Sequence, residues 1–274
     1  MSVKTLEYGR PLTAREAGVR ALLWRAYAET QLTFRVVTTD GVEIRGVHFK
    51  NDFPTLLVYC HGFTSGKNTM HIKQMVETFA AELDVIAFDF RGHGESGGAT
   101  TFGDKELLDV DAVLEYAHGF GYQRTVIMGS SMGGAISIRY AADAPAVDAV
   151  ITMGAFAHKQ FSKMAMVGMG LLKWSVSRGV VKRASPTRIE RASAPYDPRD
   201  YVGRISPRPL LLLHGEHDPL IPLAHAQQLF ARAGEPKTLY VIPRGGHDLE
   251  NLTVKTLKYV LRWIKQTQGR VTHV

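Results

Sequence analysis

The stretch from Val126 to Gly134, Val-Ile-Met-Gly-Ser-Ser-Met-Gly-Gly, constrains the fold of this chain more than any other feature. Its apolar start predicts a buried strand, and the residues after it predict a helix. Gly129-x-Ser131-x-Gly133 therefore lies at a strand-to-helix turn, the context in which this motif presents a nucleophilic serine. So sharp a turn strains the serine backbone and leaves no room for side chains two residues before and after it. The Ser131 Oγ is expected above the sheet at a helix N-terminus, where backbone N–H groups favour negative charge.

Predicted strands and helices alternate along most of the 274 residues, of which 45% are hydrophobic. Apolar runs that end in polar or glycine-rich loops predict strands at 33–39, 42–49, 55–60, 84–89, 126–128, 149–153, 209–215 and 238–242. Helical spacing and capping residues, among them Asp104, predict helices at about 13–29, 68–82, 104–118, 135–142, 224–233 and 251–266. This order predicts an α/β fold in which a mostly parallel sheet is covered on both faces and binds ligands at the carboxyl ends of its strands.

Residues 155–208 interrupt this alternation and separate two core segments, 1–154 and 209–274. The net charge of +7 is concentrated in this insertion: residues 155–192 contain eight basic side chains and one acid, and the rest of the chain has 25 of each sign. The eight are Lys159, Lys163, Lys173, Arg178, Lys182, Arg183, Arg188 and Arg191. A local basic surface argues against general nucleic-acid binding.

Other classes of protein are disfavoured by what the sequence lacks. No apolar run has the length of a transmembrane helix, and the N-terminal residues do not resemble a signal peptide. The single cysteine, Cys60, cannot form an internal disulfide, and no Cys/His cluster has the spacing of a zinc site. We therefore expect a cytoplasmic protein without a metal.

A serine hydroxyl needs an imidazole to take its proton and a carboxylate to orient that imidazole. Asp218 and His247 follow Ser131 in the chain order expected for this fold, and each comes just after a predicted strand. Glu216 is the alternative acid. We favour Asp218, because Pro219 fixes the next turn and the shorter side chain is easier to hold in place.

Several other polar residues lie near these positions and compete for the same roles. The alternatives are His214, His217, His93, Ser130 and Asp248. His214 and His93 are expected to hydrogen-bond between loops, and the Ser130 side chain is expected to point into the structure. Two backbone donors are also needed to stabilise an oxyanion, and we assign them to the N–H groups of Met132 and Phe63.

Five motifs together resemble the α/β-hydrolase superfamily. They are His61-Gly62-Phe63, Asp89-Phe90-Arg91-Gly92-His93-Gly94-Glu95-Ser96, Gly129-Ser130-Ser131-Met132-Gly133-Gly134, Leu213-His214-Gly215-Glu216-His217-Asp218 and Gly245-Gly246-His247. The resemblance covers about residues 30–267. Within the superfamily, His61-Gly62-Phe63-Thr64 and Lys67-Asn68-Thr69 resemble the serine-aminopeptidase-like and cinnamoyl-esterase-like groups.

This resemblance implies an α/β-hydrolase fold with a Ser131, Asp218 and His247 triad and an oxyanion hole formed by Phe63 and Met132. It also implies that residues 155–208 form a small, helical cap over the site, and that no cofactor is required. Serine at the elbow argues against haloalkane dehalogenases and epoxide hydrolases, whose members carry aspartate there.

The insertion is expected to decide which substrate reaches Ser131. Its adaptable methionines suit an acyl or aromatic group, although they equally suit plain packing of the cap. The expected substrate contacts are Met153, Met164, Met166, Met169 and Trp174. The basic residues form either a solvated outer face or a surface for an anionic membrane or an acidic acyl carrier.

The sequence thus predicts a serine hydrolase that cleaves small to medium carboxylic esters through an acyl-enzyme. Acyl thioesterase, lipase or monoacylglycerol lipase, and serine aminopeptidase use the same residues and remain alternatives. Alternatives of another class are a cofactor-free haloperoxidase or perhydrolase and a non-catalytic binding scaffold.

Overall fold

The computed structural model describes residues 31–69, 75–76, 78–159, 187–190, 196–247, 251 and 253–267. The expected helix at 13–29 and most of the insertion lie outside these residues. In the described part, no helix is long and apolar enough to cross a membrane.

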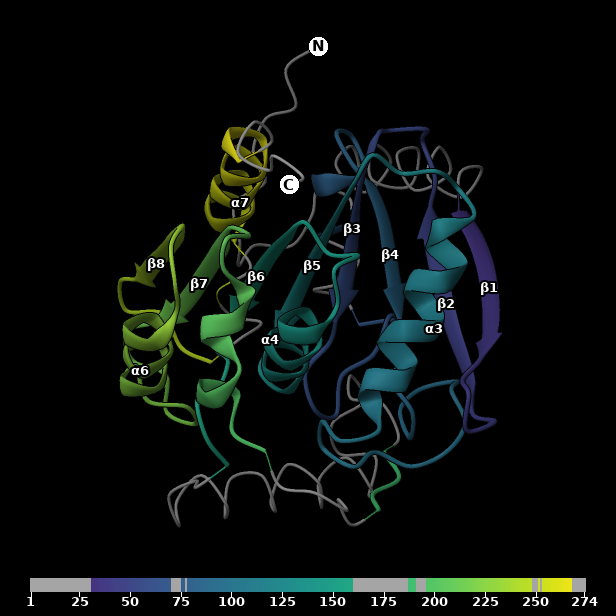
Figure 1. Ribbon diagram of the computed structural model, residues 1–274, viewed down its shortest axis with the longest axis horizontal. Coiled ribbons are helices and arrows are strands. Elements are labelled where there is room, and N and C mark those ends of the chain that lie inside the picture. Colours follow the sequence, from purple (N-terminus) through teal and green to yellow (C-terminus); the bar gives the residue numbers. More distant parts are fainter. Residues whose placement is uncertain are drawn as a thin grey trace, which may run out of the picture.

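The described strands form one twisted sheet, with the order β1-β2-β4-β3-β5-β6-β7-β8 (Figure 1). Their bounds are β1 Gln31–Val37, β2 Glu43–Phe49, β3 Thr55–Cys60, β4 Asp84–Phe88, β5 Arg124–Ser130, β6 Ala149–Met153, β7 Leu210–Gly215 and β8 Lys237–Ile242. β2 pairs antiparallel with β1 and β4, and from β4 to β8 all neighbouring strands are parallel. The predicted mostly parallel sheet is confirmed, and its parallel strands bring their following loops to one edge.

Helices cover both faces of the sheet, as predicted. Figure 1 shows α3 (Glu106–His118), α4 (Met132–Asp143) and α6 (Ala224–Arg232) in front of the sheet. The amphipathic α7 (Val254–Gln266) packs its apolar side into a separate buried cluster on the other face. Along β3, Leu56 and Val58 belong to the first cluster, while Leu57 and Tyr59 belong to the second. A strand buried on both faces needs apolar residues at every position, which explains its continuous hydrophobic run.

The starts of two helices differ from the prediction. Asp104 does not cap α3, whose N-cap is Lys105 without a side-chain cap bond. The buried Glu106 carboxylate instead accepts hydrogen bonds from the backbone N–H groups of Thr101 and Gly103, and so holds the loop before the helix. α7 begins at Val254 and is capped by Thr253, three residues later than expected.

Both described ends of the insertion pack on the core. Ala155 and Ala157 follow β6 into the first buried cluster, and Val202 and Ile205 join it from the other end. The returning end forms two short 3-10 helices, η1 (Pro198–Asp200) and η2 (Val202–Ile205), and both contact α4. Any cap would therefore be built from residues between these ends.

Candidate active site

The turn between β5 and α4 has the strained geometry that its sequence predicts. Ser131 has φ 49° and ψ −113°, although it is not a glycine. Its N–H donates to the Met153 carbonyl over 2.8 Å, which fixes the turn against the end of β6. A Cβ added to Gly129 would lie 2.2 Å from the Gly133 carbonyl oxygen, and one added to Gly133 would lie 2.1 Å from the Cys60 carbonyl oxygen. Only glycine fits at either position, because the opposing atoms are backbone.

Gly133→Ala should therefore destabilise the fold by about 1–3 kcal/mol, the usual cost of forcing an extra methyl into a packed region. Urea unfolding measures this change. Gly119→Ala is the matched control, because the added Cβ would lie 3.6 Å from its nearest neighbour, the Tyr116 carbonyl oxygen. Equal free energies of unfolding for the two variants would contradict the steric argument.

Ser131, His247 and Asp218 form a continuous chain of hydrogen bonds. His247 Nε2 lies 3.1 Å from Ser131 Oγ, and His247 Nδ1 lies 2.6 Å from Asp218 Oδ2. The other carboxylate oxygen, Oδ1, accepts from the N–H groups of Leu220 and Ile221 at 2.9 and 2.8 Å. The Asp218 carboxylate is fully buried and oriented, so it places the proton on Nδ1 and leaves Nε2 to accept from the serine.

The competing acid and bases have other partners. Glu216 accepts from the Arg244 N–H and does not replace Asp218 at His247. His214 Nε2 donates to the Ile221 carbonyl over 2.7 Å, and desolvation lowers the pKa of His214. Ser130 is buried with its Oγ 2.8 Å from the Tyr59 hydroxyl, as expected. Asp248 lies outside the described residues.

Two buried histidines hold the loop that carries Phe63. His61 Nδ1 donates to the Gly62 carbonyl, so its Nε2 accepts from the Phe90 N–H over 2.9 Å. His93 Nε2 lies 3.4 Å from the N–H of Thr64, which it accepts at the edge of hydrogen-bond reach. Burial lowers the pKa of both rings, that of His93 to about 3. Neutral imidazoles keep a lone pair for these N–H groups, so the expected loop-tying role of His93 is present in the structure.

An ion pair holds the far end of the same loop. Lys67 Nζ donates to Asp89 Oδ2 over 2.6 Å, and the Lys67 N–H donates to Asp89 Oδ1 over 2.7 Å. The two side chains are 4% and 2% exposed, and Lys67 also pairs with Glu95. The loop 61–67 is thus held at both ends, with Phe63 between them. Met132, the assigned second donor, is the first residue of α4, where backbone N–H groups lack intrahelical partners.

A sequence model described as "Alpha/beta hydrolase family" matches residues 57–253 of this chain. The chain belongs to the alpha/beta hydrolase family. The uncharacterized protein YfhR of Escherichia coli (strain K12) is 29% identical to this hydrolase over 198 residues, which are 70% of the chain and 62% of YfhR. The chain therefore spans less than two thirds of that relative. The uncharacterized protein YqkD of Bacillus subtilis is 26% identical over 226 residues, 78% of this chain and 72% of YqkD.

Solved esterase structures share the fold of this hydrolase. A Pyrococcus furiosus esterase superposes with a TM-score of 0.72 and 24% identity, over 87% of this chain and 93% of that one. A thermophilic esterase from Thermogutta terrifontis, with malate bound, gives a TM-score of 0.68 and 21% identity over 86% and 99% of the two chains. At these identities the similarity establishes the α/β-hydrolase fold, and the chemistry has to be argued from the site.

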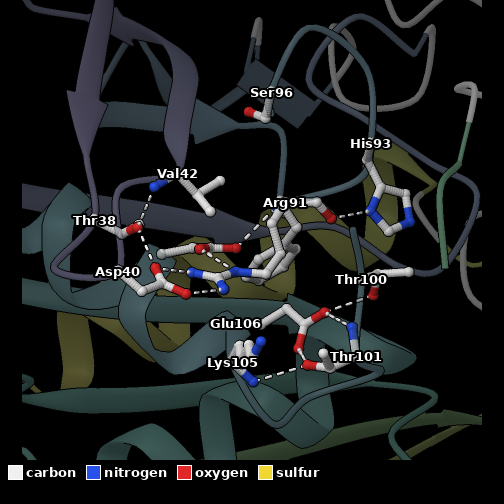
Figure 2. A network of polar contacts seen from close by, with 12 residues as sticks. Thr38, Asp40, Val42, Arg91, His93, Ser96, Thr100, Thr101, Lys105 and Glu106 are labelled. Atoms are coloured by element: carbon white, nitrogen blue, oxygen red, sulfur yellow. Dashed lines mark hydrogen bonds and ion pairs between the residues drawn. The ribbon is translucent and has the colours of Figure 1, made fainter. Parts of the chain in front are cut away.

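Beneath the Phe63 loop, the hydrolase contains a buried arginine that our residue-level prediction assigned no role. Arg91 donates to Asp109 through its backbone N–H and Nε, each over 2.8 Å. Its two terminal nitrogens donate to both carboxylate oxygens of Asp40 at 2.8 and 3.0 Å (Figure 2). The Arg91 carbonyl accepts from His93 Nδ1, so the network is continuous with the histidine that contacts the Phe63 loop.

The structure corrects one expected substrate contact. Met153 is fully buried, and its side chain belongs to the cluster on the α7 face of the sheet. Side chains alternate across a strand, so the residue whose carbonyl holds Ser131 directs its side chain away from the α4 face. Met164, Met166, Met169 and Trp174 lie outside the described residues. Among the described residues, no group of three or more His, Cys, Asp or Glu side chains is arranged to hold a metal ion.

Three phenylalanines form a cluster beside the candidate site, and two of them were absent from the prediction. The Phe63 and Phe102 ring centroids are 5.5 Å apart, and Phe102 stacks on Phe156 at 5.7 Å. Phe102 has φ 58°, an unusual conformation for an aromatic residue. A scan for catalytic residue types overlooks such residues, because isolated phenylalanines are ordinary core residues.

Proposed function

We propose that this alpha/beta hydrolase is a serine carboxylesterase that cleaves small to medium acyl esters through an acyl-enzyme intermediate. The hydrogen-bonded chain from Ser131 Oγ through His247 to the buried Asp218 carries the proposal. The strained backbone of Ser131 supports it, because such strain persists where surrounding structure maintains it and often marks a functional residue. The fold shared with two esterases agrees with this class of reaction.

In the first step, Ser131 Oγ attacks the ester carbonyl carbon while His247 Nε2 takes the hydroxyl proton. The new Oγ–C bond converts the carbonyl oxygen into an oxyanion. Asp218 stabilises the imidazolium that forms, because its carboxylate is buried and already hydrogen-bonded to Nδ1. We assign the oxyanion contacts to the N–H groups of Met132 and Phe63, which belong to rigidly held segments.

In the second step, the oxyanion reforms the carbonyl, the bond between the acyl carbon and the leaving oxygen breaks, and His247 gives its proton to that oxygen, so the alcohol leaves. Water then attacks the acyl carbon while His247 takes a proton from it. The Oγ–C bond breaks, His247 returns that proton to Ser131 Oγ, and the carboxylic acid leaves. The same positions serve acylation and deacylation, so no further group has to move into place.

A fluorophosphonate probe tests this proposal because it reacts with activated serines. The wild-type protein should be labelled at Ser131, and Ser131→Ala should not be labelled. Ser130→Ala is the matched control, since Ser130 is adjacent but buried and hydrogen-bonded to Tyr59. That variant should still be labelled. A folded wild-type protein that resists the probe, or a Ser131→Ala variant that takes it, would overturn the proposal.

Substrate class is ranked in the same preparation with p-nitrophenyl esters of increasing chain length, an acyl-CoA and an aminoacyl anilide. We expect the highest kcat/KM for the esters of short and medium acyl chains. A higher kcat/KM for the acyl-CoA or the anilide would reassign the enzyme to the thioesterases or aminopeptidases while retaining the serine mechanism.

A further inference from the structure

The phenylalanine cluster of Phe63, Phe102 and Phe156 lies between the candidate oxyanion loop and the residues that support the triad. Phe63 belongs to that loop, and Phe156 packs against Ala135 and Ile221 in a common buried cluster that Phe102 also contacts. Ala135 donates its N–H to the Ser131 carbonyl. The cluster therefore packs on the first turn of α4, whose N-cap is the proposed nucleophile.

Ile221 connects the same cluster to the proposed acid. Its N–H donates to Asp218 Oδ1 over 2.8 Å. On the other side, Gly154 lies against the His247 ring, and Phe156 follows two residues later. Each member of the proposed triad is thus connected to the phenylalanine cluster through a neighbouring residue, and Phe63 and Phe102 are the partly exposed rings of that cluster.

Lys159 lies at the edge of this cluster. Its Nζ is 5.9 Å from the Phe102 ring centroid and 4.2 Å from the Tyr196 ring centroid. The Arg139 guanidinium shares the Tyr196 ring at 4.5 Å, so one aromatic ring serves two cations. Burial lowers the pKa of Lys159, and within the described part of the chain its Nζ makes neither a hydrogen bond nor an ion pair. An ammonium group offers three N–H donors, and the aromatic rings beside this half-buried lysine provide no carboxylate or carbonyl oxygen for them.

Three carboxylates interact electrostatically with Lys159, and each already has another hydrogen-bond or ion-pair partner. Asp197 pairs with a neighbouring arginine, Asp104 lies 3.7 Å from Arg139, and Glu106 accepts from the loop before α3. Residues 155–189 contain seven basic side chains and no acid. This stretch of the insertion therefore contributes no acidic side chain to offset the ammonium group.

We propose that Lys159 binds an anionic group, a carboxylate or a phosphate, on the ester substrate. The inference rests on the proposed function, because the ester carbonyl must lie at Ser131. The apolar chain between the two groups would pack on Phe63 and Phe102, the partly exposed rings, and the anion would accept charge-assisted hydrogen bonds from Nζ. This hydrolase would then favour half-esters of dicarboxylic acids or phosphate-bearing esters over neutral esters of equal size.

The test compares charged and neutral esters on Lys159→Met, which retains the length and apolar stem of lysine. One pair is p-nitrophenyl hemiglutarate with p-nitrophenyl valerate, and the other is butyryl glycerol phosphate with glyceryl monobutyrate. We expect Lys159→Met to raise KM at least tenfold for one charged ester and to change kcat/KM for both neutral esters less than twofold. The first pair reports a carboxylate on the acyl side, and the second reports a phosphate on the alcohol side.

Two further variants separate anion binding from packing. Lys159→Arg should restore most of the preference for the charged ester, because it keeps the charge. Lys105→Met should have no effect, since that lysine is 41% exposed and pairs with Glu190. Equal losses for charged and neutral esters in Lys159→Met, or no loss in either, would overturn the inference.

Binding to Ser131→Ala distinguishes failure of this inference from failure of the proposed function. Titration calorimetry should show that the Ser131→Ala protein binds the hemiglutarate and glycerol phosphate esters. Adding Lys159→Met should weaken the affinity for the more tightly bound ester at least tenfold. Unchanged affinity would refute the role of Lys159 even if Ser131 reacts with the fluorophosphonate. Loss of affinity without any ester turnover in the wild type would support Lys159 and refute the esterase proposal.

Discussion

Asp218→Asn should lower kcat for ester hydrolysis by about 10,000-fold, the loss typical of an orienting carboxylate in a serine triad. Asparagine can still accept from Leu220 and Ile221 through Oδ1, so the loop geometry should persist. Its amide would face His247 Nδ1 and favour the tautomer with the proton on Nε2, which cannot accept from Ser131. The rate of p-nitrophenol release from p-nitrophenyl butyrate gives kcat, and circular dichroism shows whether the fold is retained.

Glu216→Gln is the matched control for this experiment. Glu216 lies two residues before Asp218 on the same loop, but its carboxylate accepts from the Arg244 N–H. We expect kcat to change less than about threefold, because a surface substitution outside the site leaves the triad in place. If Glu216→Gln were the more damaging variant, our assignment of the orienting acid to Asp218 would be wrong.

Arg91→Met should cost about 3–5 kcal/mol of unfolding free energy, because it leaves a buried carboxylate without its partner. Arg91 is 1% exposed, and Asp109 is fully buried behind it. Burial raises the pKa of Asp109, and the hydrogen bonds and charge of Arg91 oppose that rise. Without the guanidinium, Asp109 keeps the hydrogen bond from the backbone N–H of residue 91 but loses the charge and the side-chain hydrogen bond that offset its desolvation. Urea unfolding at pH 7 measures the loss.

Arg232→Met provides the comparison at the surface. Arg232 pairs with Asp200 at 3.4 Å, and the two side chains are 53% and 62% exposed. Exposed pairs of this kind contribute less than about 1 kcal/mol. Similar losses of unfolding free energy in Arg91→Met and Arg232→Met would contradict the argument that burial makes the Arg91 network strongly stabilising.

The Arg91 network also predicts how stability responds to acid. Arg91 donates two hydrogen bonds to Asp40 and lowers the pKa of that carboxyl from 3.8 to about 2. A carboxyl with a lowered pKa stabilises the fold above its unfolded pKa, and this contribution is lost as the pH falls from about 4 to about 2. Over that interval, the unfolding free energy should therefore fall more steeply in the wild type than in Arg91→Met. Urea unfolding at a series of pH values measures this change. Equal pH dependence of the unfolding free energy in the two proteins would contradict the ion pair between Arg91 and Asp40.

The arrangement of strands and helices followed closely from local patterns. β3 is buried on both faces, so its sequence is one apolar run, and the observed bounds Thr55–Cys60 match the predicted ones. The amphipathic α7 shows the opposite pattern, with one apolar side packed on the sheet. Helix starts were less predictable. Asp104 has a favourable capping side chain, but in the structure the N-cap is Lys105, and the Asp104 carboxylate lies 3.7 Å from Arg139.

Residues of the candidate site could be recognised from the sequence where a catalytic residue type directly follows a predicted strand. Ser131, Asp218 and His247 follow β5, β7 and β8, and parallel strands carry such loops to one edge. Residues that contribute by packing were not recognisable in this way. Met153 was expected near the site below the insertion, yet strand alternation directs its side chain to the other face. Phe102, Phe156 and Lys159 gain a possible function only from what they contact.

The sequence by itself determined the order of elements, the glycines of the elbow and the loops that carry the site. These follow from local sterics and from the period of apolar residues, which act within one element or one turn. Only the tertiary structure decided which carboxylate meets His247, how Arg91 is neutralised and where the Lys159 ammonium lies. Those outcomes depend on contacts such as Ser131 with His247, 116 residues apart, which no local pattern specifies.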